Sequence, residues 1–144
     1  MRCYNSNMII LRDATEKDMP LIDEIALKFD LDSNDTDFKQ FIVADDNGKI
    51  AGFGRLIRRE NALELGTIGV LESYRNRGIG KMVINELIKR ADDDLYLTTL
   101  IPKYFEQFGF KKMDTPAPSS MIRKKEWCEG CKQVGCTVMK RAKS

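Results

Sequence analysis

The sequence predicts a single mixed α/β (α+β) domain. Three patterns predict this class: an apolar run followed by a helical pattern at the start, three consecutive strand-like runs in the middle, and alternating helix and strand patterns after Gly78. With 144 residues, the chain is long enough for one compact core and too short for two ordinary domains. We therefore expect one domain over 8–144, with a cysteine-containing C-terminal segment over 119–144 and a flexible leader over 1–7.

Composition and charge exclude several classes of protein. Hydrophobic residues make up 42% of the chain and charged residues 32%, which is typical of a soluble globular protein. No apolar run approaches the roughly 18 residues that a membrane span needs. The 24 Lys and Arg residues are interleaved with 22 Asp and Glu residues, so no single-sign field predicts binding to nucleic acid or to a membrane. The first residues, "MRCYNSN", lack the apolar core of a signal peptide, and a cytoplasmic location is expected.

A strand and a helix are expected first. The run "MIILRDA" (8–14) reads as a strand, and Thr15 is a candidate N-cap with Asp18 three residues later. Pro20 suits the first turn of a helix, where a backbone N–H is not needed. Apolar residues follow at helical spacing, at Leu21, Ile22, Ile25, Ala26 and Phe29.

Three antiparallel strands are expected next. Residues 41–60, "FIVADDNGKIAGFGRLIRRE", contain two apolar runs joined by Asp46-Asn47-Gly48, which is a strong short-range signal for a hairpin. The run "ALELGTIGVL" (62–71) continues this meander as a third strand.

Helix and strand patterns alternate in the last part of the chain. From Gly78, apolar residues recur at steps of four up to the acidic run 92–94, which predicts a helix. The run "LYLTTL" (95–100) is typical of a short buried strand, and Pro102 opens a short helix that Gly109 closes. The last two strands are expected at "FKKM" (110–113) and "CTVM" (136–139).

The stretch 74–81, "YRNRGIGK", combines two glycines with several cations at the expected start of a helix. The first amides of a helix have no intrahelical acceptor, and the helix dipole attracts anions to them. Glycine allows a ligand to approach the backbone, and the cations complement phosphate. The stretch is not a Walker A motif, because of Arg75 and Met82, nor a dinucleotide fingerprint, because Val83 replaces the third glycine. A surface turn that uses glycine for positive φ is the alternative.

The pattern Arg75-x-x-Gly78-x-Gly80 resembles the acetyl-CoA pyrophosphate loop of the GNAT N-acetyltransferase superfamily. The likeness extends over about 8–112 and includes "YFEQFGF" (104–110), which is similar to the family's Phe-Tyr-x-x-x-Gly-Phe element. The resemblance implies a GNAT fold, with a mixed, mostly antiparallel central sheet, helices on both faces and a V-shaped splay of two strands. It also implies acetyl-CoA as co-substrate, and the family commonly forms homodimers.

The resemblance further implies roles for individual residues. Main-chain groups of Ile68, Gly69 and Val70 would meet the pantetheine arm and the thioester carbonyl. The amide of Val70 would be the oxyanion donor, because a fixed backbone dipole needs no reorganisation. The pyrophosphate would be held by the loop that comprises Arg75, Asn76, Arg77, Gly78, Ile79, Gly80 and Lys81.

A general base is needed because an aliphatic ammonium with a pKa of about 10 is mostly protonated at neutral pH. Glu64 matches the position at which many GNAT enzymes keep a glutamate base, and the alternative is an outward-facing strand residue. The family's tyrosine acid is replaced by Phe105, which is a departure from the pattern. Tyr104 is the remaining candidate acid, and packing is the alternative role for both aromatic residues.

Three of the four cysteines, Cys128, Cys131 and Cys136, lie in the C-terminal segment, and the chain contains no histidine. A tetrahedral zinc site usually takes four Cys or His ligands, so these thiols would need the distant Cys3, a carboxylate or water. Metal or iron–sulfur binding, a redox-sensitive disulfide and structural thiols remain alternatives, and no metal site is predicted.

The segment from "LYLTT" to "YFEQFGF", the later prolines, the cysteines and the closing "TVM" resemble short GNAT proteins of the N-acetylglutamate synthase type. This resemblance implies an acyltransferase that moves acetyl from acetyl-CoA to the primary amine of a small molecule, such as glutamate, in amino-acid metabolism. Arg12, Arg55 and Lys103 are the cations considered for a substrate carboxylate. The alternatives are a non-catalytic acetyl-CoA-binding redox or metal sensor and a peptide or protein N-acetyltransferase.

Overall fold

The computed structural model describes residues 9–32, 35–113, 117–121 and 137–143. The chain divides into two compact units. The first comprises Met1–Leu56 and Thr67–Arg90, and the second comprises Ile57–Gly66 and Ala91–Ser144. The expected leader over 1–7 lies outside the described residues, and the single domain over 8–144 stays a prediction.

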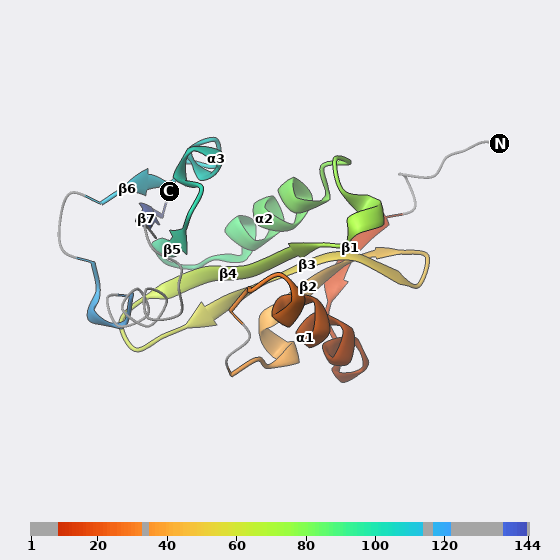
Figure 1. Cartoon of the computed structure of the whole chain (residues 1–144). Coiled ribbons are helices and arrows are strands. Elements are labelled where there is room, and N and C mark those ends of the chain that lie inside the picture. Colours follow the sequence, from red (N-terminus) through yellow and green to blue (C-terminus); the bar gives the residue numbers. More distant parts are fainter. Residues whose placement is uncertain (1–8, 33–34, 114–116, 122–136, 144) are drawn as a thin grey trace. The chain divides into compact units, whose positions relative to one another are not determined.

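Seven strands of the described chain form one sheet in the order β1-β2-β3-β4-β5-β7-β6 (Figure 1). β1 with β2, β2 with β3, β5 with β7 and β6 with β7 pair antiparallel, whereas β4 and β5 pair in parallel. The predicted mixed, mostly antiparallel sheet is therefore confirmed. The strands are β1 (Ile9–Asp13), β2 (Phe41–Asp46), β3 (Lys49–Arg58), β4 (Leu63–Val70), β5 (Leu95–Thr99), β6 (Lys111–Lys112) and β7 (Thr137–Arg141).

Helices lie on both faces of the sheet in the first unit, as expected: α1 covers one face and α2 the other (Figure 1). A short third helix, α3, belongs to the second unit. The α-helices of the described chain are α1 (Met19–Lys28), α2 (Ile79–Arg90) and α3 (Pro102–Glu106), and 3-10 turns lie at η2 (Glu16–Asp18), η3 (Phe38–Gln40) and η4 (Glu72–Tyr74).

The turn between β2 and β3 is the predicted hairpin. Asn47 has a φ of 52° and Gly48 a φ of 97°. Positive φ at both central residues is typical of a type I′ turn, whose twist matches that of the flanking strands. The register of the two strands shifts after Ala44, and this β-bulge lets Ile50 and Phe53 join the same core.

A separate 3-10 turn precedes α1. Thr15 caps η2, and its backbone N–H donates to Asp18 Oδ2 at 2.7 Å, as the sequence pattern predicts. α1 itself begins at Met19. Pro20 therefore lies in the first turn of α1, where a backbone N–H would have no intrahelical acceptor and proline is tolerated.

A hydrophobic core lies between α1 and the sheet. The rings of Phe41 and Phe53 meet edge to face in this core, with centroids 6.2 Å apart. Burial of a large apolar side chain stabilises a fold by about 1.5–3 kcal/mol, so this cluster holds α1 against the sheet. The buried members are Ala14, Ile22, Ile25, Phe41, Val43, Ile50 and Phe53.

Glycines on β3 allow α2 to approach the opposite face closely. A Cβ at Gly52 would lie 2.8 Å from Ile79 Cγ2 and 3.0 Å from the carbonyl oxygen of Gly69. A Cβ at Gly54 would lie 2.8 Å from Val83 Cγ1. Because van der Waals repulsion opposes contacts this short, the close approach of α2 requires glycine at both positions.

The second unit has its own core. The rings of Phe105 and Phe110 lie 6.1 Å apart, and Phe110 is buried. α3 ends at Glu106, and Gly109 follows with a φ of 91°. The buried apolar residues of this unit include Leu63, Leu65, Leu95, Leu97, Phe108, Phe110, Met121 and Met139.

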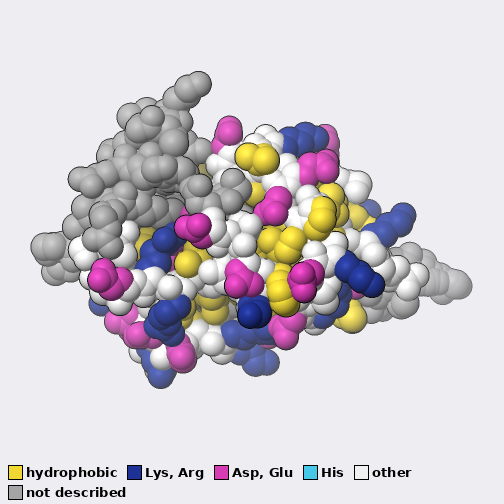
Figure 2. Space-filling model, turned by 90° about the horizontal axis from the view of Figure 1, so that it is seen from below, with side chains coloured by type: hydrophobic (Ala, Val, Ile, Leu, Met, Phe, Trp, Pro, Cys, Tyr) yellow, Lys and Arg dark blue, Asp and Glu magenta, His cyan; other side chains and the backbone are white. Residues whose placement is uncertain are grey.

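Charged side chains of both signs are interspersed on the face drawn in Figure 2, in agreement with their interleaving along the sequence. Within the described ranges, α-helices fall short of the length and apolar character that a membrane crossing requires.

Arg12 on β1 ties together η2 and β2. Its Nη1 donates to Asp18 Oδ2 at 2.9 Å and its Nε to Asp45 Oδ2 at 2.7 Å. The hydrogen bond from Arg12 lowers the pKa of Asp18 and that of Asp45 from the ordinary value of 3.8. A carboxyl group whose pKa is lower in the folded chain stabilises the fold above its unfolded pKa, and this stability is lost as the pH falls through the folded pKa.

We expect Asp18→Asn to lower the free energy of unfolding by about 1–3 kcal/mol at pH 7, because Arg12 loses a charge-assisted hydrogen bond. The difference from the wild type should shrink as the pH falls from 3.8 through the lowered pKa of Asp18, since the wild-type carboxylate is then protonated too. Urea unfolding over a descending pH series measures this difference. A difference that stays constant over the series would contradict the assignment to the ion pair.

Candidate functional site

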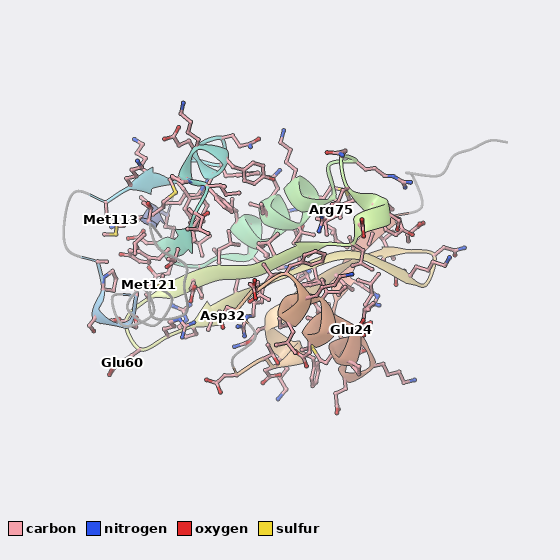
Figure 3. All side chains as sticks on the ribbon, viewed as in Figure 1. Glu24, Asp32, Glu60, Arg75, Met113 and Met121 are labelled. Carbon is pink, nitrogen blue, oxygen red and sulfur yellow. The ribbon has the colours of Figure 1, made fainter. Side chains whose placement is uncertain are left out.

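The chain turns sharply between β4 and α2. After η4, Asn76 (φ 65°) and Gly78 (φ 78°) take the left-handed conformation, and α2 begins at Ile79. A Cβ at Gly78 would meet no atom within 4 Å, so the space beside this glycine is open. Residues 75–81 are termed the cradle loop, and Figure 3 labels Arg75 at its start.

The amides of the cradle loop are largely unpaired. Arg75 N–H donates to Glu72 O at 3.3 Å, and Met82 N–H donates to Gly78 O at 3.1 Å. For the amides of residues 76–81, the described part of the chain supplies no acceptor. Unpaired donors at the positive end of a helix dipole form an arrangement that binds anions.

The cations of the cradle loop are exposed. Arg75 turns back: its Nε donates to Val70 O at 3.3 Å, and its guanidinium carbon lies 4.7 Å from the centre of the Phe29 ring. The guanidinium carbon of Arg77 lies 5.2 Å from the centre of the Tyr74 ring. Arg75 therefore links the cradle loop to the end of β4, whereas Arg77 packs against Tyr74 of η4.

The last residues of β4 direct alternate amides to opposite sides. Leu71 N–H donates to Ala51 O of β3 at 2.9 Å. Because successive N–H groups of a strand point in opposite directions, the amides of Val70 and Ile68 point away from β3. Ile68 and Val70, which are predicted to contact the co-substrate, thus have N–H groups that do not bond to β3.

Gly69, which was predicted to offer main-chain groups to the co-substrate, is also required by packing. A Cβ at Gly69 would lie 2.5 Å from Phe53 Cζ. The ring of Phe53 belongs to the core under α1. Glycine is therefore needed at this position whether or not a ligand binds.

Thr67 interrupts β4 with a φ of 51°. Positive φ is rare for a β-branched residue and persists only where neighbouring groups hold it. The Thr67 hydroxyl donates to Asp32 O at 2.8 Å and accepts from Arg55 Nε at 2.8 Å. Sequence reasoning missed Thr67, because the residue type favours an extended strand and carries no signal for positive φ.

The cations considered for a substrate carboxylate have different surroundings. Arg12 is bonded to Asp18 and Asp45. Arg55 is buried and bonded within the chain, and Lys103 is exposed on α3. Arg12 and Arg55 therefore act first as structural cations.

Glu64 lies on β4 in the second unit and is fully buried. Its Oε1 accepts from Arg59 Nε at 2.5 Å, and the parallel register pairs Glu64 with Tyr96 of β5. A Cβ at Gly66 would lie 3.6 Å from Glu64 Oε2. The alternative of an outward-facing strand residue is therefore wrong, and Arg59 fixes the orientation of the carboxylate. The role of Glu64 as a general base stays a prediction.

Sequence reasoning also missed Arg59. Arg59 N–H donates to Ala62 O at 2.8 Å, so Glu60 and Asn61 form a two-residue hairpin loop. Long side chains can meet diagonally across an antiparallel pair, which brings Arg59 to Glu64. A two-residue loop at Glu60 and Asn61, if recognised in the sequence, would have predicted that Arg59 and Glu64 lie close together.

The aromatic residues of α3 pack against one another. Tyr104 is 39% exposed, and its ring lies 5.1 Å from that of Phe105 and 5.5 Å from that of Phe108. These contacts support a packing role for Tyr104 and Phe105. The role of Tyr104 as an acid stays a prediction.

The C-terminal cysteines Cys128, Cys131 and Cys136 lie outside the described residues. In the ranges that the structure does describe, no group of three or more His, Cys, Asp or Glu side chains could hold a metal ion.

Sequence comparison identifies relatives of the chain. A family model described as the acetyltransferase (GNAT) family matches residues 8–110, which is more than half of the chain. An uncharacterized N-acetyltransferase of Chlorobaculum tepidum is 25% identical over 128 residues, which cover 83% of this chain and 80% of the relative.

Solved structures share the fold. Rv2747 from Mycobacterium tuberculosis, in complex with CoA, has a TM-score of 0.72 at 19% identity and is matched over 94% of this chain and 99% of its own. The N-acetylglutamate synthase of Neisseria gonorrhoeae, complexed with coenzyme A and L-arginine, has a TM-score of 0.73 at 17% identity. That match covers 94% of this chain and 33% of the synthase, and at such identities the likeness concerns the fold alone. Because the family match extends over residues 8–110, the chain belongs to the GNAT family of acetyltransferases.

Proposed function

We propose that this protein transfers the acetyl group of acetyl-CoA to the primary amine of a small molecule. The observation that carries the proposal is the set of unpaired amides at the start of α2, beside open space at Gly78, in a chain of the GNAT family. Two proteins that share the fold were solved with coenzyme A. The pyrophosphate of acetyl-CoA is the kind of anion that such amides bind.

The cradle loop binds the pyrophosphate chiefly through its main chain. Gly78 leaves room for phosphate oxygens to approach the amides, and the exposed Arg77 and Lys81 supply positive charge. Arg75 is bonded to Val70 O, so it also holds the loop against the end of β4. The loop and the strand end therefore position the co-substrate together.

The amides of Ile68 and Val70 receive the rest of the co-substrate. Both point away from β3, and neither needs to reorganise when a ligand arrives. The amide of Val70 stabilises the negative charge that develops on the thioester oxygen, since it is a preorganised donor. The amide of Ile68 holds the pantetheine arm.

Glu64 takes the proton from the acceptor ammonium, directly or through a water molecule. Arg59 fixes the direction of the carboxylate through the bond at 2.5 Å. A free amine is then available to attack the thioester carbon. Tyr96 of β5 is the register partner of Glu64.

The thiolate of CoA leaves without a strong acid. A thiol pKa of about 8.5 makes the thiolate a tolerable leaving group, so the replacement of the family's tyrosine by Phe105 does not prevent turnover. Tyr104 stays the candidate acid on α3, where its ring is partly exposed.

An amino acid such as glutamate is the proposed acceptor. The support is the likeness in fold to the N-acetylglutamate synthase of Neisseria gonorrhoeae, which was also solved with N-acetyl-glutamate, at a TM-score of 0.73 and 15% identity. The match covers 36% of that protein, so the activity of the whole synthase is not transferred to this chain. A cytoplasmic location and a homodimer are proposals that rest on the family alone.

A panel of amines tests this function. CoA release from acetyl-CoA is measured with glutamate, other amino acids, polyamines and a peptide with a free N-terminus. Turnover of free amino acids supports the proposal, and turnover of the peptide alone indicates a peptide acetyltransferase. Tight binding of acetyl-CoA without turnover of any amine would overturn the proposal in favour of a sensor.

We expect Gly78→Val to weaken CoA binding by about tenfold or more, because a branched side chain strains the positive φ and fills the open space beside the amides. Gly48→Val is the matched control, since Gly48 also has a positive φ and open space at its Cβ position. Both variants should lose a similar amount of thermal stability. Calorimetric titration with CoA measures the affinity, and an equal loss in both variants would contradict the role of the cradle loop.

We expect Glu64→Gln to lower kcat/KM for the best amine by about 10²–10⁴-fold, because the amide cannot accept the proton. Arg59→Gln breaks the same buried ion pair but keeps the carboxylate, so it serves as the control for structural damage. Its kcat/KM, corrected for the folded fraction, should fall less than that of Glu64→Gln. Equal losses in the two variants would assign Glu64 a structural role.

A further inference from the structure

Arg55 is a fully buried arginine that the mechanism above does not use. A buried guanidinium is costly unless its N–H groups are bonded, so its partners indicate what it holds. The aromatic face of Phe41 lies beside it, with the guanidinium carbon 5.4 Å from the ring centre. Its hydrogen-bond acceptors include Thr67 Oγ1 at 2.8 Å, Gln40 Oε1 at 2.8 Å, Asp32 O at 3.3 Å and Asp35 O at 3.4 Å.

These acceptors join three parts of the first unit that are distant in sequence. Asp32 and Asp35 belong to the α1–η3 connection, Gln40 ends η3, and Thr67 belongs to β4. Asp32 O accepts from both the Thr67 hydroxyl and Arg55. Figure 3 labels Asp32 on the side of the sheet that α1 covers. One guanidinium on β3 thus ties the α1–η3 connection to β4.

The bond to Thr67 falls on the residue whose backbone is strained. Thr67 has a φ of 51°, which a β-branched residue keeps only under restraint. Its hydroxyl is restrained on both sides, by Arg55 Nε and by Asp32 O. Without these bonds, Thr67 is free to return to an extended conformation, and the direction of the following amides changes with it.

We propose that Arg55 and Thr67 are positioning residues for acetyl transfer. They hold the left-handed turn in β4 that aims the amides of Ile68 and Val70. The inference rests on the proposed function, because it assigns Val70 the oxyanion. It concerns chiefly the chemical step, since the acceptors Thr67, Gln40, Asp32 and Asp35 all lie outside the cradle loop.

Thr67→Val and Thr67→Ser form the first test. Valine keeps the shape of threonine but loses the hydroxyl, so kcat should fall about 10–100-fold. KM for acetyl-CoA should rise by less than about tenfold, because the amide of Ile68 is only one of the proposed contacts with the co-substrate. Serine restores the hydroxyl, and its kcat should lie within about threefold of the wild type. A kcat of Thr67→Val that equals the wild-type value would overturn the inference, and so would a failure of serine to rescue a folded protein.

Arg55→Lys and Arg90→Gln form the second test. Lysine keeps the charge at position 55 but cannot span the same acceptors, so kcat should fall as in Thr67→Val. Arg90→Gln removes the ion pairs of Arg90 with Asp13 and Glu86 and should lower Tm without changing kcat of the folded protein. Equal loss of kcat in both arginine variants, in proportion to lost folded protein, would show that Arg55 is only structural.

Hydrogen exchange separates this inference from the proposed function. If the wild type acetylates no amine, the proposed function fails, and exchange alone then decides the inference. Thr67→Val should speed exchange in peptides that cover residues 67–71 and the α1–η3 connection, while the affinity for CoA falls by less than about tenfold. Unchanged exchange in both segments would overturn the positioning role whatever the activity.

Discussion

The missing side chain at Gly52 is the constraint on which the rest of the site depends. Ile79, the first residue of α2, and Gly69, near the end of β4, both lie close to the backbone of Gly52 on β3. A methyl group there would meet Ile79 at 2.8 Å and the carbonyl oxygen of Gly69 at 3.0 Å. A flexible side chain could move aside, but a carbonyl within a paired strand cannot do so cheaply. The start of α2 and the end of β4, whose amides are proposed to contact the co-substrate, therefore both pack closely against Gly52.

Buried polar groups are distributed unevenly over this fold. Arg12 and its two aspartates remain partly accessible, and their bonds stabilise the junction of β1, β2 and η2. Arg55 and Glu64 are fully buried on neighbouring strands of the sheet, where a charge is expensive to desolvate and adds little net stability. Arg55 restrains the Thr67 turn through its bond to the Thr67 hydroxyl, and Arg59 restrains the carboxylate of Glu64.

Most elements of the fold could be predicted because their causes are local. Asn47-Gly48 favours positive φ at two adjacent residues and so predicts the hairpin, and the apolar period from Ile79 predicts α2. The cradle loop could also be predicted from local sequence, since its glycines and the start of the helix lie within a few residues of each other. The role of Glu64 as a candidate base could be inferred only through the resemblance to the GNAT family. Its burial and its bond to Arg59 depend on the length of a hairpin loop that the strand pattern alone did not define.

The sequence by itself determined the order of the elements, the sharp turns and the glycine-containing loop before α2, because each depends on the backbone preferences of neighbouring residues. Only the tertiary structure decided that Arg75 turns back to Val70, and that Thr67 takes a left-handed conformation in the middle of a strand. The bonds that hold Thr67 come from Arg55, twelve residues away, and from Asp32, thirty-five residues away. A conformation that is unfavourable for the residue itself, and is maintained by partners this remote, leaves no trace in the local pattern.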